Sequence, residues 1–161
     1  MSGLLRSPRL HLLLRLALGG VFVYASLDKI AEPAKFARIV YQWQVLGPLP
    51  SNLVAVTLPW IELVAGLLLL TGLRRRDAAG VLAVMLIVFI VAAVWVLAHG
   101  IEVDNCGCTS VADVPETGAW PPAWTRGVGW FLLTRNLVLL TGALVLLLVR
   151  PHTPGRPLSR P

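Results

Sequence analysis

The apolar residues of this chain fall into four long runs, separated by shorter polar stretches. The runs cover approximately residues 10–28, 53–73, 78–98 and 127–149. Each run is long enough to cross the ~30 Å hydrocarbon layer of a bilayer as a helix, because a helix rises ~1.5 Å per residue. Leu and Ala dominate the runs without the alternation of a barrel strand. The pattern therefore predicts an all-α membrane protein built as a bundle of four transmembrane helices.

The composition supports this class and excludes two others. Of 161 residues, 57% are hydrophobic and 14% are charged, with a mean hydropathy of +0.76. Soluble domains carry about 25% charged residues, and disordered chains are poor in apolar residues. We expect one membrane domain over residues 1–150 and a cytoplasmic tail rich in Pro and Arg over residues 151–161. The lipid bilayer is then the first partner of the protein.

The basic residues predict the orientation of the four spans. Most arginines lie in the two termini and in the loop 72–77, while most acidic residues lie in the segments on the opposite side. The positive-inside rule places both termini in the cytoplasm and the long loop 99–126 in the periplasm of a bacterial inner membrane. The net charge of +6 is scattered over short segments, so it indicates topology and not nucleic-acid binding. The first span is expected to remain as an anchor, although Val23-Tyr24-Ala25 also fits a signal-peptide cleavage site.

A short amphipathic segment separates the first two spans. Phe36, Ile39, Val40 and Trp43 recur at helical spacing after a proline. This pattern predicts a short interfacial helix, closed by Gly47-Pro48.

The long outer loop contains both cysteines of the chain, as Cys106-Gly107-Cys108. In an oxidising compartment such thiols tend to form disulfides, and Gly107 permits the backbone bend that a bond between near neighbours needs. The small ring would be strained, and strained exposed disulfides exchange easily, so the pair suits redox chemistry. Two alternatives stay open: thiols that are inert or bonded to a partner, and a metal site completed by His99 and Asp104. The ligand spacing matches no common zinc pattern, and we expect no metal.

The second and fourth apolar runs each contain one charged residue in their interior. Glu62 and Arg135 are each eight or nine residues from the outer end of their run, which places both roughly 12–14 Å deep. An ionised group inside a bilayer costs about 2.5–3.5 kcal/mol or more, so the two charges are expected to pair. Asn136 and Tyr24 are their expected polar neighbours. Such a pair could clamp the bundle without chemistry or take part in function.

Several short motifs follow one another in a characteristic order along residues 10–149: Gly20-Val21-Phe22, Asp28-Lys29-Ile30, Pro33 with Phe36, Pro59-Trp60-Ile61-Glu62 with Gly66, His99-Gly100-Ile101, Cys106-Gly107-Cys108, and Arg135-Asn136 with Leu140. In this order and spacing the chain resembles the MauE/DoxX family of small four-span, redox-associated membrane proteins. One departure concerns the loop, where Thr109-Ser110 follows the cysteines and the family usually has Phe-Gly. The cysteines themselves are kept.

The resemblance implies a role in methylamine metabolism. Its MauE branch is associated with processing, export or disulfide formation of the small, cysteine-rich subunit of methylamine dehydrogenase, alongside a periplasmic thioredoxin-like protein. We therefore expect an accessory protein whose Cys106 and Cys108 exchange thiols and disulfides with a periplasmic partner. A thiolate would need a basic neighbour such as Lys29 or Arg126, because acidic residues flank the cysteines.

Two further functions remain as alternatives. One is a non-catalytic factor for membrane assembly or export, and the other is a small-solute carrier that uses Glu62 and Arg135. No cofactor is expected. A membrane quinone is compatible with a redox loop above a helix bundle, but no residue pattern identifies a site for one.

Overall fold

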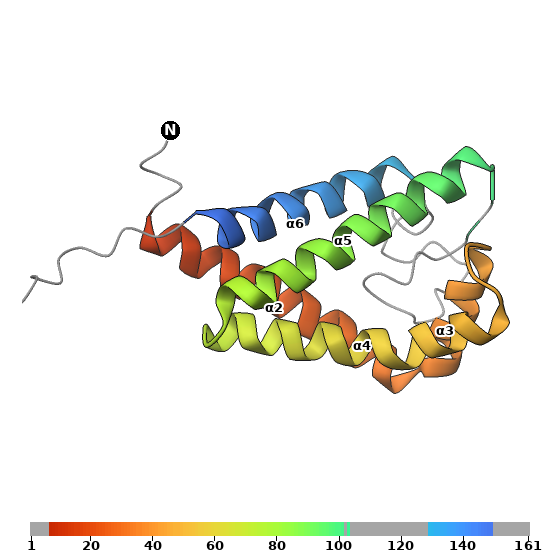
Figure 1. Cartoon of the computed structure of the whole chain (residues 1–161), viewed down its shortest axis with the longest axis horizontal. Coiled ribbons are helices and arrows are strands. Elements are labelled where there is room, and N and C mark those ends of the chain that lie inside the picture. Colours follow the sequence, from red (N-terminus) through yellow and green to blue (C-terminus); the bar gives the residue numbers. More distant parts are fainter. Residues whose placement is uncertain (1–6, 102, 104–128, 150–161) are drawn as a thin grey trace, which may run out of the picture.

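The computed structural model describes residues 7–101, 103 and 129–149, and all regular secondary structure within them is helical. The helices are α2 (Pro8–Ala31), α3 (Pro33–Gln42), α4 (Pro48–Thr71), α5 (Arg75–Ala98) and α6 (Trp130–Leu148), as Figure 1 shows. Four of them, all except α3, are long and apolar enough to cross a membrane. The predicted bundle of four spans with one short additional helix is confirmed.

Prolines set the beginnings of three helices. Pro8, Pro33 and Pro48 each occupy the first turn, where a missing N–H costs nothing because that N–H has no partner within the helix. Pro48 thus starts α4 five residues earlier than the apolar run at residue 53 predicts. At the other end of α4, Gly72 adopts a left-handed φ of 76° and donates its N–H to the carbonyl of Leu68 at 3.0 Å.

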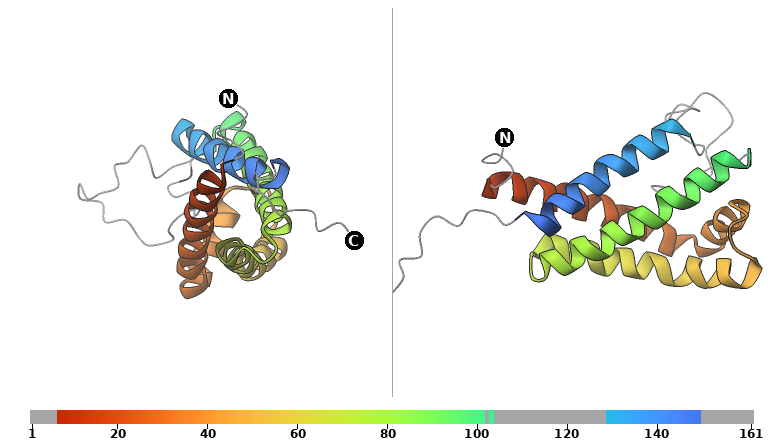
Figure 2. Two further views of the ribbon diagram at one scale, coloured as in Figure 1. Left: turned by 90° about the vertical axis from the view of Figure 1, so that its left-hand side faces the viewer. Right: turned by 45° about the horizontal axis from the view of Figure 1, so that its top comes forward.

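The helices form two closely packed pairs, α2 with α4 and α5 with α6. Contacts of α4 with α5 and of α2 with α6 close the bundle, which Figure 2 shows from one end. The start of α2, the α4–α5 turn and the end of α6 lie together at what we call the tail end of the bundle. Helix α3, the end of α5 and the start of α6 lie at the opposite, loop end. The first and last described helices therefore begin and end, respectively, at the same end of the bundle.

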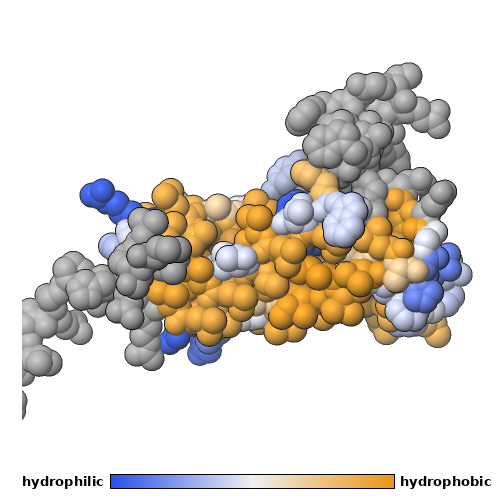
Figure 3. Space-filling model, turned by 90° about the horizontal axis from the view of Figure 1, so that it is seen from above, coloured by the Kyte–Doolittle hydropathy of each residue, from blue (hydrophilic) through white to orange (hydrophobic). Residues whose placement is uncertain are grey.

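The surface of the bundle suits lipid. On the face shown in Figure 3, apolar side chains cover the middle and hydrophilic residues gather towards the two ends. Large apolar side chains stay exposed along the long helices; Val84, Val88 and Val138, for example, are 62%, 62% and 71% exposed. A monomeric soluble protein rarely exposes apolar surface so extensively.

Two glycines bring α2 and α4 close together. A Cβ atom on Gly19 would lie 2.7 Å from Cγ of Leu70, and one on Gly66 would lie 2.9 Å from Cγ2 of Val23. A larger residue at either position would require the neighbouring side chain or helix to shift. Small residues commonly allow such close packing between membrane helices.

Arginines complete the tail end by binding helix carbonyls. Arg15 of α2 donates from Nε to the carbonyl of Leu69 and from Nη2 to that of Leu70, both at 3.0 Å. Arg76 donates from Nε to the carbonyl of Leu147 at 3.0 Å. Carbonyls in the last turn have no partner within the helix, and a cation there also interacts favourably with the negative end of the helix dipole. Arg15 thus ties α2 to the end of α4.

Candidate functional site

A buried ion pair joins α2 to α4. Lys29 donates from Nζ to Oε2 of Glu62 at 2.7 Å, and the two side chains are 1% and 2% exposed. The pair therefore lies out of contact with solvent and lipid, where each charge alone would be costly. Its position on the two most extensively packed helices allows the pair to fix their register.

Helix α3 covers the cationic side of this pair. The ring of Phe36 is 1% exposed, and its centroid lies 5.3 Å from Nζ of Lys29, within the range of a cation–π contact. The α3 sequence forms an amphipathic helix because Phe36, Ile39 and Trp43 share one face, and all three are buried. The short interfacial helix predicted from the sequence is therefore a lid over Lys29 as well as a connector.

The predicted ion pair between Glu62 and Arg135 is wrong, because the partner of Glu62 is Lys29. The error comes from the early start of α4 at Pro48. The outer turns of α4 extend past the end of α2, so the last turn of α2 lies level with the middle of α4. Tyr24 was also expected beside Glu62, but it is 68% exposed.

Arg135 and Asn136 nevertheless lie near Glu62, on the wall of one small cavity. All four long helices contribute to this cavity, α5 through Phe89. Its volume is about 20 Å³, which is sufficient for about one water molecule. The expected neighbourhood of Glu62, Arg135 and Asn136 is thus confirmed, although the pairing is different.

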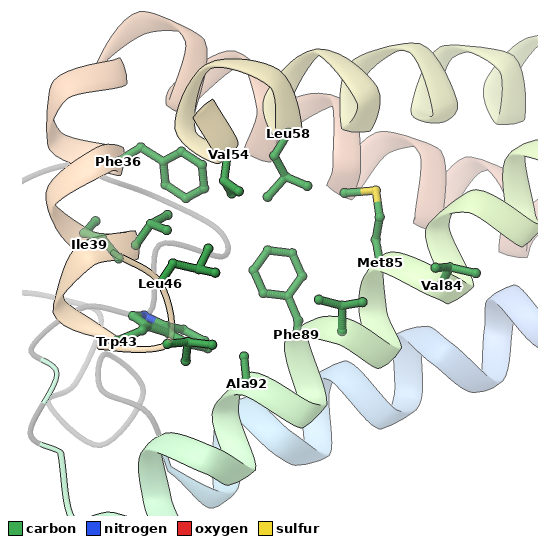
Figure 4. A pocket seen from close by; sticks show the side chains of 13 residues that line it. Phe36, Ile39, Trp43, Leu46, Val54, Leu58, Val84, Met85, Phe89 and Ala92 are labelled. Carbon is green, nitrogen blue, oxygen red and sulfur yellow. The ribbon is translucent and has the colours of Figure 1, made fainter. Parts of the chain in front are cut away.

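A larger cavity lies between α3, α4 and α5 (Figure 4). Its volume is about 310 Å³, and Phe36 and Phe89 point into it from opposite sides. The lining is apolar, and two lining residues, Val84 and Val88, are also exposed on the bundle surface. The cavity is therefore suited to hydrocarbon and not to a polar solute.

The beginning of the long loop is held at the loop end of the bundle. His99 ends α5, with its ring stacked on Trp95 at 3.9 Å between centroids and Nδ1 2.9 Å from the carbonyl oxygen of Trp95. Gly100 follows with a left-handed φ of 62°, which turns the chain. Val103 is 7% exposed and packs in one apolar cluster with Phe36 and neighbouring residues.

The cysteine motif itself, with Cys106, Gly107 and Cys108, lies outside the described residues, as does Asp104. The predicted redox pair therefore stays a prediction, and so does the alternative metal site. Within the described part of the chain, no group of three His, Cys, Asp or Glu residues is placed to hold a metal ion.

The role of Lys29 was the main feature that sequence reasoning missed. The sequence predicts Lys29 as a possible basic neighbour of the cysteines, whereas the structure buries it against Glu62. Phe36, seven residues after Lys29, is the sequence feature that could have indicated the burial of Lys29. An aromatic residue on the apolar face of the next helix can cover a cation that ends the preceding helix.

Comparison with known proteins identifies relatives of the whole bundle. The model of the family described as methylamine utilisation protein MauE matches residues 7–149. A curated relative, methylamine utilization protein MauE of Paracoccus denitrificans, is 33% identical over 147 residues, which cover 91% of this chain and 73% of the relative. No solved structure matches the chain.

Proposed function

We propose that this chain, which belongs to the MauE family of methylamine utilisation proteins, is a redox-active accessory protein of methylamine dehydrogenase maturation. The family and the four spans make it a multi-pass membrane protein of the methylamine utilisation system. The observation that carries the finer proposal is the Cys106-Gly107-Cys108 motif, which contains both cysteines of the chain.

The proposed chemistry is a transfer of two electrons by thiol–disulfide exchange. A thiolate of the cysteine-rich client attacks one sulfur of the Cys106–Cys108 disulfide, forming a mixed disulfide and releasing the other cysteine as a thiolate. The second client thiol then attacks the mixed disulfide, so the client gains a disulfide and Cys106 and Cys108 become thiols. A periplasmic thioredoxin-like protein in its disulfide form reoxidises the pair by the same two steps and leaves as a dithiol. No bound cofactor takes part.

The geometry at the loop end supports this proposal. His99 and Val103 hold the beginning of the loop against the bundle. Cys106 follows Val103 by three residues, and a chain spans at most about 3.6 Å per residue. The chain length between Val103 and the motif thus limits how far Cys106 can reach from the held beginning of the loop. A tethered pair can meet membrane-bound or membrane-adjacent clients repeatedly without diffusing away.

The bundle has a supporting role in this proposal. The Lys29–Glu62 pair and Phe36 fix α3 against α2 and α4, and the apolar cluster on α3 holds Val103. Lys29 thus acts by positioning the loop end, and its ammonium is held by Glu62. The orientation that we propose places the loop in the periplasm and both termini in the cytoplasm of the bacterial inner membrane.

The solute-carrier alternative receives no support from the bundle. Glu62 is paired with Lys29, and the cavity that it shares with Arg135 and Asn136 has a volume of about 20 Å³. That volume accommodates about one water molecule and no larger solute.

Trapping of mixed disulfides tests the redox proposal. In cells that express the methylamine dehydrogenase subunits, Cys106→Ser and Cys108→Ser should each be analysed on non-reducing gels after acid quenching. We expect a covalent adduct with the thioredoxin-like protein to accumulate with one of the two variants, because the remaining thiolate attacks the disulfide of that protein, releasing one of its cysteines as a thiolate, and no second cysteine is left to resolve the mixed disulfide. The adduct should disappear on reduction.

The double variant Cys106→Ser/Cys108→Ser is the matched control, because it leaves the chain without any cysteine. It should form no adduct and should fail to support client maturation. Normal maturation with the double variant would exclude the redox role and favour the non-catalytic assembly factor.

A further inference from the structure

The small cavity lined by all four long helices borders a buried polar group that lacks a hydrogen-bond partner among the described residues. Asn136 of α6 is 3% exposed, and in the described part of the chain its Nδ2 has no hydrogen-bond acceptor. A buried N–H group without an acceptor costs about 1–3 kcal/mol. Natural structures usually satisfy such groups through protein atoms or an ordered water.

An acceptor cannot be supplied by the apolar part of the wall, which includes Phe22, Phe89 and Leu139. Glu62 also lines the cavity, and among the described residues its carboxylate receives one hydrogen bond, from Nζ of Lys29 to Oε2. A carboxylate has about four acceptor sites, so Glu62 can accept further hydrogen bonds. The cavity of about 20 Å³ exceeds the ~10–15 Å³ that one water molecule requires.

We propose that this cavity binds a single structural water molecule between Asn136 and Glu62. The water accepts a hydrogen bond from Nδ2 of Asn136 and donates one to the carboxylate of Glu62. A reversed assignment of the Asn136 amide changes only the direction of the first bond, because water is both donor and acceptor. The proposal is independent of the chemistry proposed for the cysteines.

This water connects helices that otherwise share little direct packing. Helix α6 packs mainly on α5 and less extensively on α2, whereas Glu62 belongs to α4. The water therefore extends the Lys29–Glu62 pair into a polar network that reaches α6. It also returns part of the hydration that the carboxylate loses on burial.

NMR on the full chain in lipid nanodiscs tests for the water directly. Labelling with ¹⁵N-asparagine gives side-chain signals from only Asn52, Asn105 and Asn136, and loss of a signal in Asn136→Leu identifies that residue. We expect the Asn136 amide protons to show cross-peaks to water with opposite signs in NOE and ROE spectra, which indicate a long-lived bound water and not chemical exchange. Asn52, which is exposed, should show no such bound water. Absence of these cross-peaks from a resolved Asn136 signal would mean that the cavity is dry and would overturn the proposal.

The stability of Asn136→Leu gives a second test, because a hydrated cavity and a dry cavity predict changes of opposite sign in the unfolding equilibrium. Leu is similar in size to Asn but has no amide. If Asn136 binds water, Asn136→Leu breaks the network and should raise the unfolding equilibrium constant in mixed micelles about five- to tenfold. If the amide is dry, the substitution removes an unsatisfied group and the constant should fall or stay unchanged, which would overturn the proposal. Asn52→Leu, at an exposed position of α4, is the matched control and should change the constant little.

Discussion

Replacing Lys29 by methionine tests the central ion pair, because methionine keeps the length of the side chain and removes its ammonium. The Nζ–Oε2 distance is 2.7 Å and both side chains are almost completely buried. At an effective dielectric constant of about 20, unit charges at this distance attract each other by about 6 kcal/mol. Removal of one partner also leaves a buried charge without compensation, and such changes typically cost about 3–5 kcal/mol.

We therefore expect Lys29→Met and Glu62→Leu each to lower the free energy of unfolding by about 3–5 kcal/mol. The double variant should lose much less than the sum, because no charge then stays uncompensated in the bundle. The resulting coupling energy should be at least about 3 kcal/mol. Reversible unfolding by SDS in mixed micelles, followed by far-UV circular dichroism, measures all three variants and the wild type.

An exposed pair in the same chain is the control for this cycle. Arg74 and Asp77 approach to 3.5 Å, but their side chains are 75% and 70% exposed. Their coupling should stay below about 1 kcal/mol. If Lys29 and Glu62 were additive to within about 0.5 kcal/mol, the buried pair would not contribute in the way that the structure indicates.

Three further predictions concern packing and topology. Gly19→Ala should destabilise the bundle by about 1–3 kcal/mol, because the new Cβ would lie 2.7 Å from the side chain of Leu70. Gly20→Ala, whose Cβ would have no atom within 4 Å, should be neutral or stabilising. Equal effects of the two substitutions on SDS unfolding would contradict the close approach of α2 and α4. Gly72→Ala should lower the free energy of unfolding by about 1–2 kcal/mol, because Gly72 has a left-handed φ of +76°. Gly80→Ala, within α5, should raise it by up to about 1 kcal/mol. Thermal unfolding compares the two variants, and an unchanged stability of Gly72→Ala would refute the argument from backbone strain. A reporter fused after Arg76 should report the cytoplasm, and a membrane-impermeant thiol reagent should label the cysteine loop from outside; the reverse pattern would invert the proposed topology.

Much of the fold is predictable from the sequence, because the bilayer simplifies the problem. A spanning helix must be apolar over roughly 20 residues, so its presence can be read from hydropathy alone. Pro33 and the spacing of Phe36, Ile39 and Trp43 likewise indicated α3 before any packing was known. Helix boundaries were less certain, as Pro48 illustrates: it can end one helix or begin the next, and here it begins α4.

The polar interior of the bundle was less predictable, because hydropathy and depth do not determine which faces of helices meet. Glu62 and Arg135 were found as buried charges, and both do line one cavity. Depth along the apolar run does not reveal their relation to Lys29, because α4 begins at Pro48, five residues before that run.

The sequence by itself determined four spans, the short interfacial helix, the charge asymmetry and the presence of a single Cys-Gly-Cys motif. These features follow from local composition and from the cost of placing polar groups in hydrocarbon. Only the tertiary structure decided that Glu62 pairs with Lys29, that Phe36 covers this pair, and that Asn136 faces a cavity of about 20 Å³. Those facts depend on how closely α2 and α4 approach at Gly19 and Gly66, and on how far α4 extends beyond α2. Such distances arise from the packing of residues remote in sequence, which no local pattern encodes.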